Sequence, residues 1–144
     1  MNRELYNRIN IFFSKKENQI FRGNPVSDEE IDKAQKELHV KFIQDYIDFL
    51  KNFGGSYVGV PIYGFNNSKM LSSQTVVDIT NEFRENYKQD NRCPIIQESY
   101  VISITGSGDP VMVTPSGEIL IFYHDSDSQE IYSQSFSELI EKNL

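Results

Sequence analysis

The hydrophobic pattern of this chain changes its period once, at Gly54-Gly55, and this change constrains the fold more than any other feature. Before the two glycines, apolar residues recur at helical spacing. After them, most apolar residues fall in short runs rich in β-formers and separated by Gly and Pro. Helices and antiparallel strands grouped in different parts of a chain are typical of an α+β domain, not of alternating βαβ units. We therefore expect the helices of residues 27–53 to cover one face of a mainly antiparallel sheet built from residues 57–132.

Local signals place the individual elements. Ser27 and Glu30 form a capping box, and Val26 and Ile31 have the spacing of a hydrophobic staple, so a helix is expected to begin here. Gly54 offers the left-handed conformation that ends a helix. The predicted helices cover 5–13, 27–38, 42–53, 75–87 and 136–140. The predicted strands cover 57–60, 62–65, 100–105, 111–113, 119–123 and, as a short edge strand, 130–132.

Charge is distributed unevenly along the 144 residues, which carry a formal net charge of -7. Residues 93–144 hold eight acidic residues and one basic residue, Lys142, and no Lys or Arg occurs between Cys93 and Glu141. This balance disfavours nucleic-acid binding, because phosphate contacts need basic side chains. It suits a basic protein partner, since opposite charges speed association. An acidic surface that serves only solubility is the alternative.

The remaining composition indicates a compartment. No apolar run approaches the roughly 20 residues of a membrane-spanning helix, and the first residues lack the apolar core of a secretion signal. Cys93 is the only cysteine, which excludes an internal disulfide and a zinc site built from cysteines. We expect a soluble cytoplasmic protein that does not bind membranes.

An ordered set of short motifs extends from about Val26 to Ile140. The motifs are Ser27-x-x-Glu30-Ile31, Glu37-Leu38-x-Val40-Lys41, Asp45-Tyr46-x-x-Phe49-Leu50, Gly54-Gly55, Tyr63-Gly64-Phe65, Gly106-x-Gly108-Asp109, Gly117-Glu118, His124-Asp125 and Ser135-Phe136-x-Glu138-Leu139. Their order resembles the SUKH superfamily, which includes fungal cell-wall assembly regulators and many bacterial immunity proteins. The chain departs from that pattern at His39, where members often have Gly, at Phe42-Ile43, where they often have Leu-Pro, and in having no Trp.

The resemblance implies one SUKH-like domain over residues 1–144, with N-terminal helices packed on the sheet, a closing C-terminal helix and a binding function without catalysis. It further implies an immunity protein that neutralises a cognate secreted toxin, frequently a nuclease, by stoichiometric binding. An acidic surface would meet the basic groove that a nuclease needs for its own substrate. The fungal branch implies the alternative, a scaffold or regulatory module with several partners.

Three stretches approach a catalytic or ligand-binding motif and lack a required feature. Gly106–Val111 lacks the third glycine of a dinucleotide loop. The stretch that begins at Asp125 has Glu130 and Phe136 where a calcium loop needs Gly and a bidentate Glu. His124 beside Asp125 could be half of a catalytic pair, but no Gly-x-Ser-x-Gly elbow exists, and adjacent strand residues point to opposite faces. We expect no catalytic residues, no metal site and no cofactor.

The candidate partner-binding residues form three groups. The main group consists of acids at or near turns after Cys93, and a second group lies at helical spacing on one side of the fourth helix. Two tyrosines are candidate interface anchors because Tyr is enriched at binding hot spots, with core packing as the equal alternative. The three groups are, in this order, Asp109, Glu118, Asp125 and Asp127; Asp78, Glu82 and Glu85; and Tyr57 and Tyr63.

Overall fold

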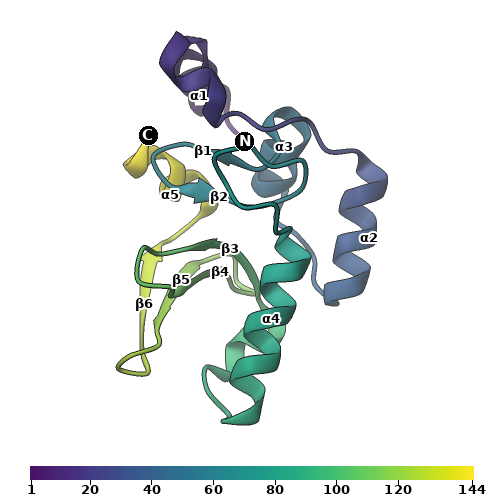
Figure 1. The fold of residues 1–144 in the computed structure, drawn as a ribbon, viewed down its shortest axis with the longest axis vertical. Coiled ribbons are helices and arrows are strands. Elements are labelled where there is room, and N and C mark those ends of the chain that lie inside the picture. The colour runs from purple at the N-terminus through teal and green to yellow at the C-terminus, as the bar shows by residue number, and fades with distance from the viewer.

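The computed structural model describes all of residues 1–144 and confirms the α+β class (Figure 1). Three α-helices precede the strands, a fourth lies between the two sheets in sequence, and a fifth closes the chain. None of these helices combines the length and the apolar character needed to cross a membrane. The helical segments are α1 (Arg3–Ser14), the 3-10 helix η1 (Lys16–Phe21), α2 (Asp28–Leu38), α3 (Gln44–Phe53), α4 (Val76–Gln89), the 3-10 helix η2 (Pro94–Glu98) and α5 (Phe136–Asn143).

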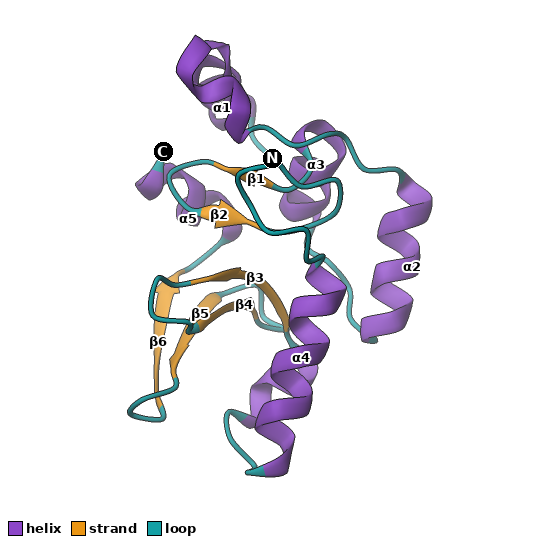
Figure 2. Ribbon diagram, viewed as in Figure 1, coloured by secondary structure: helices purple, strands orange, loops and turns teal.

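The strands form two antiparallel sheets (Figure 2). The larger sheet has four strands in the order β3-β4-β5-β6, so each strand pairs with its neighbour in sequence. The smaller sheet is the pair β1-β2. The strands are β1 (Ser56–Tyr57), β2 (Pro61–Ile62), β3 (Tyr100–Ile104), β4 (Pro110–Val113), β5 (Ile119–Tyr123) and β6 (Ser128–Ser133).

The separate β1-β2 pair differs from the single sheet predicted over residues 57–132. One backbone hydrogen bond, from the N–H of Tyr63 to the carbonyl of Ile102 at 2.8 Å, joins this segment to β3. The backbone N–H of Val101, which could have donated to a further strand, instead donates to the Thr80 hydroxyl at 2.8 Å. The Thr80 side chain on α4 therefore occupies a backbone donor that a fifth strand beside β3 would need. The strands β1 and β2 pair only with each other.

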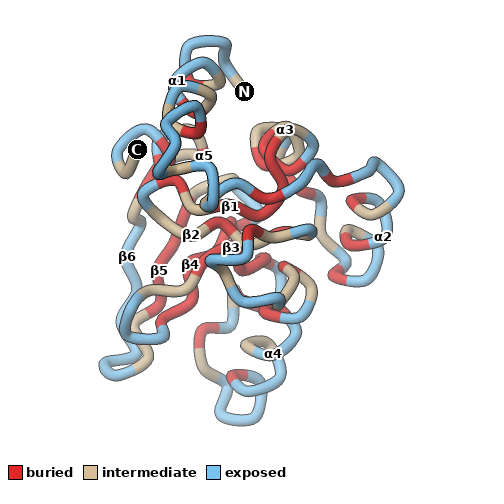
Figure 3. The backbone as a smooth tube through the Cα atoms, turned by 45° about the horizontal axis from the view of Figure 1, so that its top comes forward, coloured by how far each residue is buried: buried red, intermediate tan, exposed pale blue.

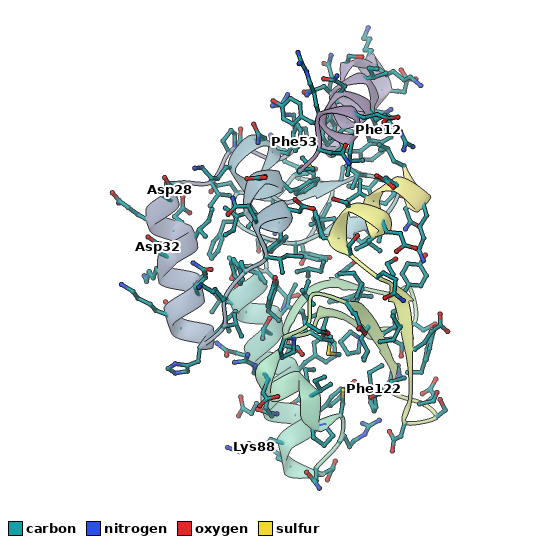
Figure 4. The ribbon with its side chains drawn as sticks, turned by 180° about the vertical axis from the view of Figure 1, so that it is seen from behind. Phe12, Asp28, Asp32, Phe53, Lys88 and Phe122 are labelled. Carbon is teal, nitrogen blue, oxygen red and sulfur yellow. The ribbon has the colours of Figure 1, made fainter.

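Helices cover both faces of the four-stranded sheet: α3 covers one, as predicted for the helices of residues 27–53, and α4 covers the other. On one face Tyr100 packs against α3, with its ring 5.6 Å from that of Tyr46. On the other face Phe122 packs against α4, with its ring 5.3 Å from that of Tyr87, and Figure 4 shows Phe122 beside this helix. Because alternate side chains of a strand enter different cores, the residues of β4 are all buried and so are four of the five in β5.

Local chemistry sets where the helices begin and end. The capping box of α2 is confirmed: the Glu30 N–H donates to the Ser27 hydroxyl at 3.2 Å, and the Ser27 N–H donates to the Glu30 carboxylate at 3.4 Å. Gly54 ends α3, as expected, but with φ 67° and ψ -169° it has a positive-φ conformation other than the left-handed helical one predicted. A second capping box at the start of α4, between Thr75 and Asp78, was not predicted.

Candidate interaction surface

Asp109 lies at the end of the β3–β4 turn and is buried, with 6% of its surface exposed. Its Oδ1 atom accepts hydrogen bonds from the His124 backbone N–H at 3.0 Å and pairs with the imidazole Nδ1 at 2.6 Å, while Oδ2 accepts from the Thr105 hydroxyl at 2.8 Å. Burial alone would raise the pKa of the Asp109 carboxyl, but these hydrogen bonds outweigh it and the pKa is lowered. The sequence placed Asp109 in the main partner-binding group, but its carboxylate is buried and ties the β3–β4 turn to the end of β5.

Two other acids of the main candidate group, Asp125 and Asp127, lie together in the β5–β6 turn. The Asp125 side chain is 89% exposed, and its Oδ1 lies 3.1 Å from the Nε2 of His124. Asp127 adopts a left-handed φ of 54° and pairs with Arg92, whose Nη2 lies 2.6 Å from the carboxylate oxygen. The Arg92 guanidinium also donates to the His124 carbonyl, which fixes the turn. Arg92 immediately precedes the stretch without Lys or Arg. The charge balance of residues 93–144 therefore does not include the cation that neutralises Asp127.

The His124 imidazole lies between two carboxylates. Its Nδ1 is paired with Asp109 at 2.6 Å and its Nε2 with Asp125 at 3.1 Å. The prediction that His124 and Asp125 point to opposite faces is wrong, because both residues lie in the turn beyond the end of β5. With both ring nitrogens facing carboxylates, the imidazole serves to join the turn to Asp109.

Glu118 lies apart from the other acids of its group. It directly precedes β5, whereas Asp125 lies beyond the other end of that strand. At about 3.3 Å per residue, the seven-residue separation corresponds to roughly 20 Å. The adjacent Gly117 faces the Ile43 side chain, just before α3. The structure therefore places Glu118 at the α3 end of the sheet and brings together only Asp125 and Asp127 on the exposed turn.

The acids of α4 are all exposed, but two of the three have partners within the chain. Asp78 accepts the Thr75 backbone N–H at 2.9 Å as part of the capping box, and Glu82 accepts from the Gln74 amide at 3.1 Å. The Glu85 side chain is exposed and makes no hydrogen bond or ion pair with another residue. These carboxylates lie at exposed positions along α4, which covers one face of the sheet.

The two predicted tyrosine anchors do meet in one place. Tyr57 and Tyr63 are half-buried and line an apolar hollow of about 490 Å³. The Tyr57 ring lies 5.1 Å from that of Phe21, and Met70, at the same hollow, is 56% exposed. The remaining lining residues are Pro61 and Leu71. Aromatic side chains and Met are typical of the centre of protein interfaces.

Strand β6 is an exposed element whose full extent the sequence did not reveal. It covers Ser128–Ser133, three residues more than the predicted edge strand, and its first four residues are exposed. Figure 3 shows β6 as an exposed strand at the outside of the sheet. Ile131 is 43% exposed although it is apolar. The alternation of apolar and polar residues that marks a strand is weak here, because residues 128–130 are all polar.

The structure thus presents three surfaces suited to protein contacts: the acidic β5–β6 turn, the open strand β6 and the aromatic hollow. Surfaces of these kinds are ones that proteins use to bind other proteins. The SUKH family model described as SMI1-KNR4 cell-wall matches residues 7–144, so the chain belongs to this family, as the motif order indicated. Domains of the family are generally non-catalytic immunity or interaction modules, including modules of the cell-wall-regulator type. No curated protein matches the chain significantly.

Proposed function

We propose that this chain is a cytoplasmic immunity protein that binds a cognate secreted bacterial toxin with a basic nuclease domain and blocks it stoichiometrically. The family supports a role in protein binding. The observation that carries the finer proposal is the acidic hairpin formed by β5, β6 and their turn. It exposes Asp125 and Glu130 within a stretch, residues 93–141, that has no Lys or Arg.

The charges of this hairpin support the choice of a basic partner. Arg92 neutralises Asp127, but Asp125 contacts only His124, and Glu130 accepts one hydrogen bond from the Tyr123 hydroxyl at 3.3 Å. A nuclease needs basic side chains along the groove that binds phosphates. Exposed carboxylates attract such a groove over about 8 Å at physiological ionic strength and raise the association rate. An antidote that occupies the groove excludes the nucleic acid.

The alternative is a non-catalytic scaffold or regulatory module of the cell-wall assembly regulator type. The aromatic hollow favours it, because Tyr57 and Tyr63 lie on the side of β3, at the opposite edge of the sheet from β6. The aromatic hollow and the acidic hairpin differ in chemistry and lie at opposite edges of the sheet, so they can bind two partners at once. An immunity protein needs only one.

Capture with the tagged chain from cells that express it separates these functions. The immunity proposal expects one basic protein, bound at a 1:1 ratio, whose nuclease activity falls to zero as the chain reaches equimolar concentration. Several substoichiometric partners, or a captured protein whose activity the chain does not inhibit, would favour the scaffold and contradict the immunity proposal.

A pair of matched double variants then tests the acidic hairpin. Asp125→Lys with Glu130→Lys should slow association with the captured toxin at least tenfold and remove most of its salt dependence. Asp32→Lys with Glu37→Lys makes the same charge change on exposed positions of α2, which lies away from β6 in Figure 1. This control should change the rate less than twofold. Equal effects of the two double variants would show that only net charge matters and would remove the hairpin from the proposal.

A further inference from the structure

The two edges of the four-stranded sheet are treated differently by the rest of the chain. At the β3 edge, Tyr63 donates its N–H to the carbonyl of Ile102 and Thr80 accepts the N–H of Val101, each at 2.8 Å. The Ser103 hydroxyl also donates to the Pro61 carbonyl at this edge. An edge covered in this way cannot pair with another chain.

The β6 edge lacks such a cover over its first four residues. The backbone of residues 128–131 makes no hydrogen bond outside its pairing with β5. This stretch contains neither Lys nor Pro, two residues that commonly protect edge strands. The register shift between Leu120 and Ile119 places a bulge at Tyr132, whose carbonyl accepts from Lys142. The open edge is therefore short and ends at this bulge.

The register also assigns the side chains of the open edge to the two faces of the sheet. Glu130 is opposite Ile121, and Ile131 is opposite Leu120. Ile121 belongs to the core on the α3 and α5 side, and Leu120 belongs to the core on the α4 side. Directly opposed residues of antiparallel strands share a face. The edge thus presents a carboxylate on one face and an apolar, 43% exposed side chain on the other.

We propose that residues 128–131 bind an extended segment of a protein partner as a fifth strand, and that this segment carries Lys or Arg on the Glu130 face and apolar residues on the Ile131 face. Main-chain hydrogen bonds to the open edge supply the affinity, and the alternate side chains supply the specificity. The inference rests on the proposed function in one respect: the partner that provides the strand is the basic toxin.

Charge selects this partner over a second copy of the chain. Two copies paired through β6 would each bring a net charge of -7 to the contact and would place the two Glu130 side chains close together. Like charges on neighbouring strands destabilise pairing. A basic strand meets Glu130 with the opposite charge and also lies beside the exposed Asp125 of the adjoining turn.

A synthetic peptide tests strand addition without the toxin. The probe is acetyl-Thr-Lys-Val-Lys-Val-Thr-amide, in which Lys and Val occupy opposite faces, titrated into the ¹⁵N-labelled chain. Amide shifts confined to residues 125–132, together with slower hydrogen exchange of those amides, are the expected result. A peptide with Glu in place of both Lys, and one with Pro in place of the first Val, should each bind at least tenfold more weakly. Shifts that map elsewhere, absence of shifts at millimolar peptide, or equal binding of the Glu peptide would overturn the proposal.

A chain variant and the captured partner complete the test. Ile131→Lys places a charge on the open edge and should weaken binding of the Lys-Val peptide at least tenfold, whereas Ile11→Lys, at an exposed position of α1, should not change it. Failure of the immunity proposal is distinguishable, because peptide binding at β6 would persist even if no inhibited toxin were captured. Conversely, a toxin that is inhibited without protecting the amides of residues 128–131 would refute strand addition while leaving the immunity function intact.

Discussion

Arg84 offers the most direct test of how this fold is held together, because one side chain connects three separate segments. Its guanidinium donates to the carbonyls of Ile96 at 3.1 Å, Leu38 at 2.9 Å and Ser99 at 2.8 Å. Leu38 is the last residue of α2, and the other two carbonyls lie in η2 and directly after it. Burial lowers the pKa of the Arg84 guanidinium, which nevertheless stays charged at all pH values of interest.

Arg84→Met keeps much of the apolar stem and removes all three hydrogen bonds. A hydrogen bond to a charged group contributes about 1.5–3 kcal/mol, and part of this is recovered because the site is only half-buried and water can reach the carbonyls. We expect a loss of about 3–4 kcal/mol in the free energy of unfolding. For a chain of this length that corresponds to a fall in Tm of roughly 10 °C. Arg84→Lys can reach only some of the carbonyls and should give an intermediate loss.

Urea denaturation and thermal melts of purified protein measure these values. Lys88→Met is the matched control, since Lys88 is an exposed cation one turn further along α4, and it should change the unfolding free energy by about 0.5 kcal/mol or less. A loss below about 1 kcal/mol for Arg84→Met, or one equal to that of the control, would refute the role assigned to the three contacts.

Three further changes have outcomes that follow from the structure. Asp109→Asn should destabilise the fold by about 2 kcal/mol at pH 7. The folded-state pKa of this carboxyl is lowered, so its contribution to the free energy of unfolding is fully present above the unfolded pKa of about 3.9 and is lost as the pH falls from there through the folded pKa. The difference between the Tm values of variant and wild type should therefore shrink by pH 3. Thr75→Ala removes the N-cap of α4 and should cost about 1 kcal/mol in urea denaturation, with no change for Ser73→Ala, an exposed serine before the helix. Gly54→Ala should prevent folding or lower the Tm by more than 10 °C, since an added Cβ would lie 2.0 Å from the Asn24 carbonyl at a φ of +67°, and a soluble variant with an unchanged melt would contradict this steric argument.

The sequence was most informative where the deciding atoms lie within a few residues of one another. The capping box of Ser27 and Glu30 depends on neighbours three positions apart, and the helix end at Gly54 depends on one backbone conformation. The same local logic would have found the box of Thr75 and Asp78.

The features that the sequence missed depend on residues brought together from distant positions. Asp109 is buried because His124, in the turn after β5, and Thr105 surround its carboxylate. Asp127 is neutralised by Arg92 from 35 positions away. The sequence therefore identifies residues 93–144 as acidic, but the free carboxylates on their surface are fewer than the eight acids counted, since Asp109 is buried and Asp127 is paired.

The sheet also divides the apolar interior into two compartments of unequal size, and this division has a consequence for local stability. The compartment on the α3 and α5 side contains 24 buried residues, and the one on the α4 side contains 8. Subglobal unfolding begins where the fewest apolar contacts must be broken. We therefore expect α4 and η2 to detach as one unit while the strands stay paired, with the bonds of Arg84 to the Leu38 carbonyl and of Thr80 to the Val101 N–H among the links that oppose this opening. The α3 and α5 side of the sheet then stays folded, and conformational change on binding another protein is concentrated on the α4 side.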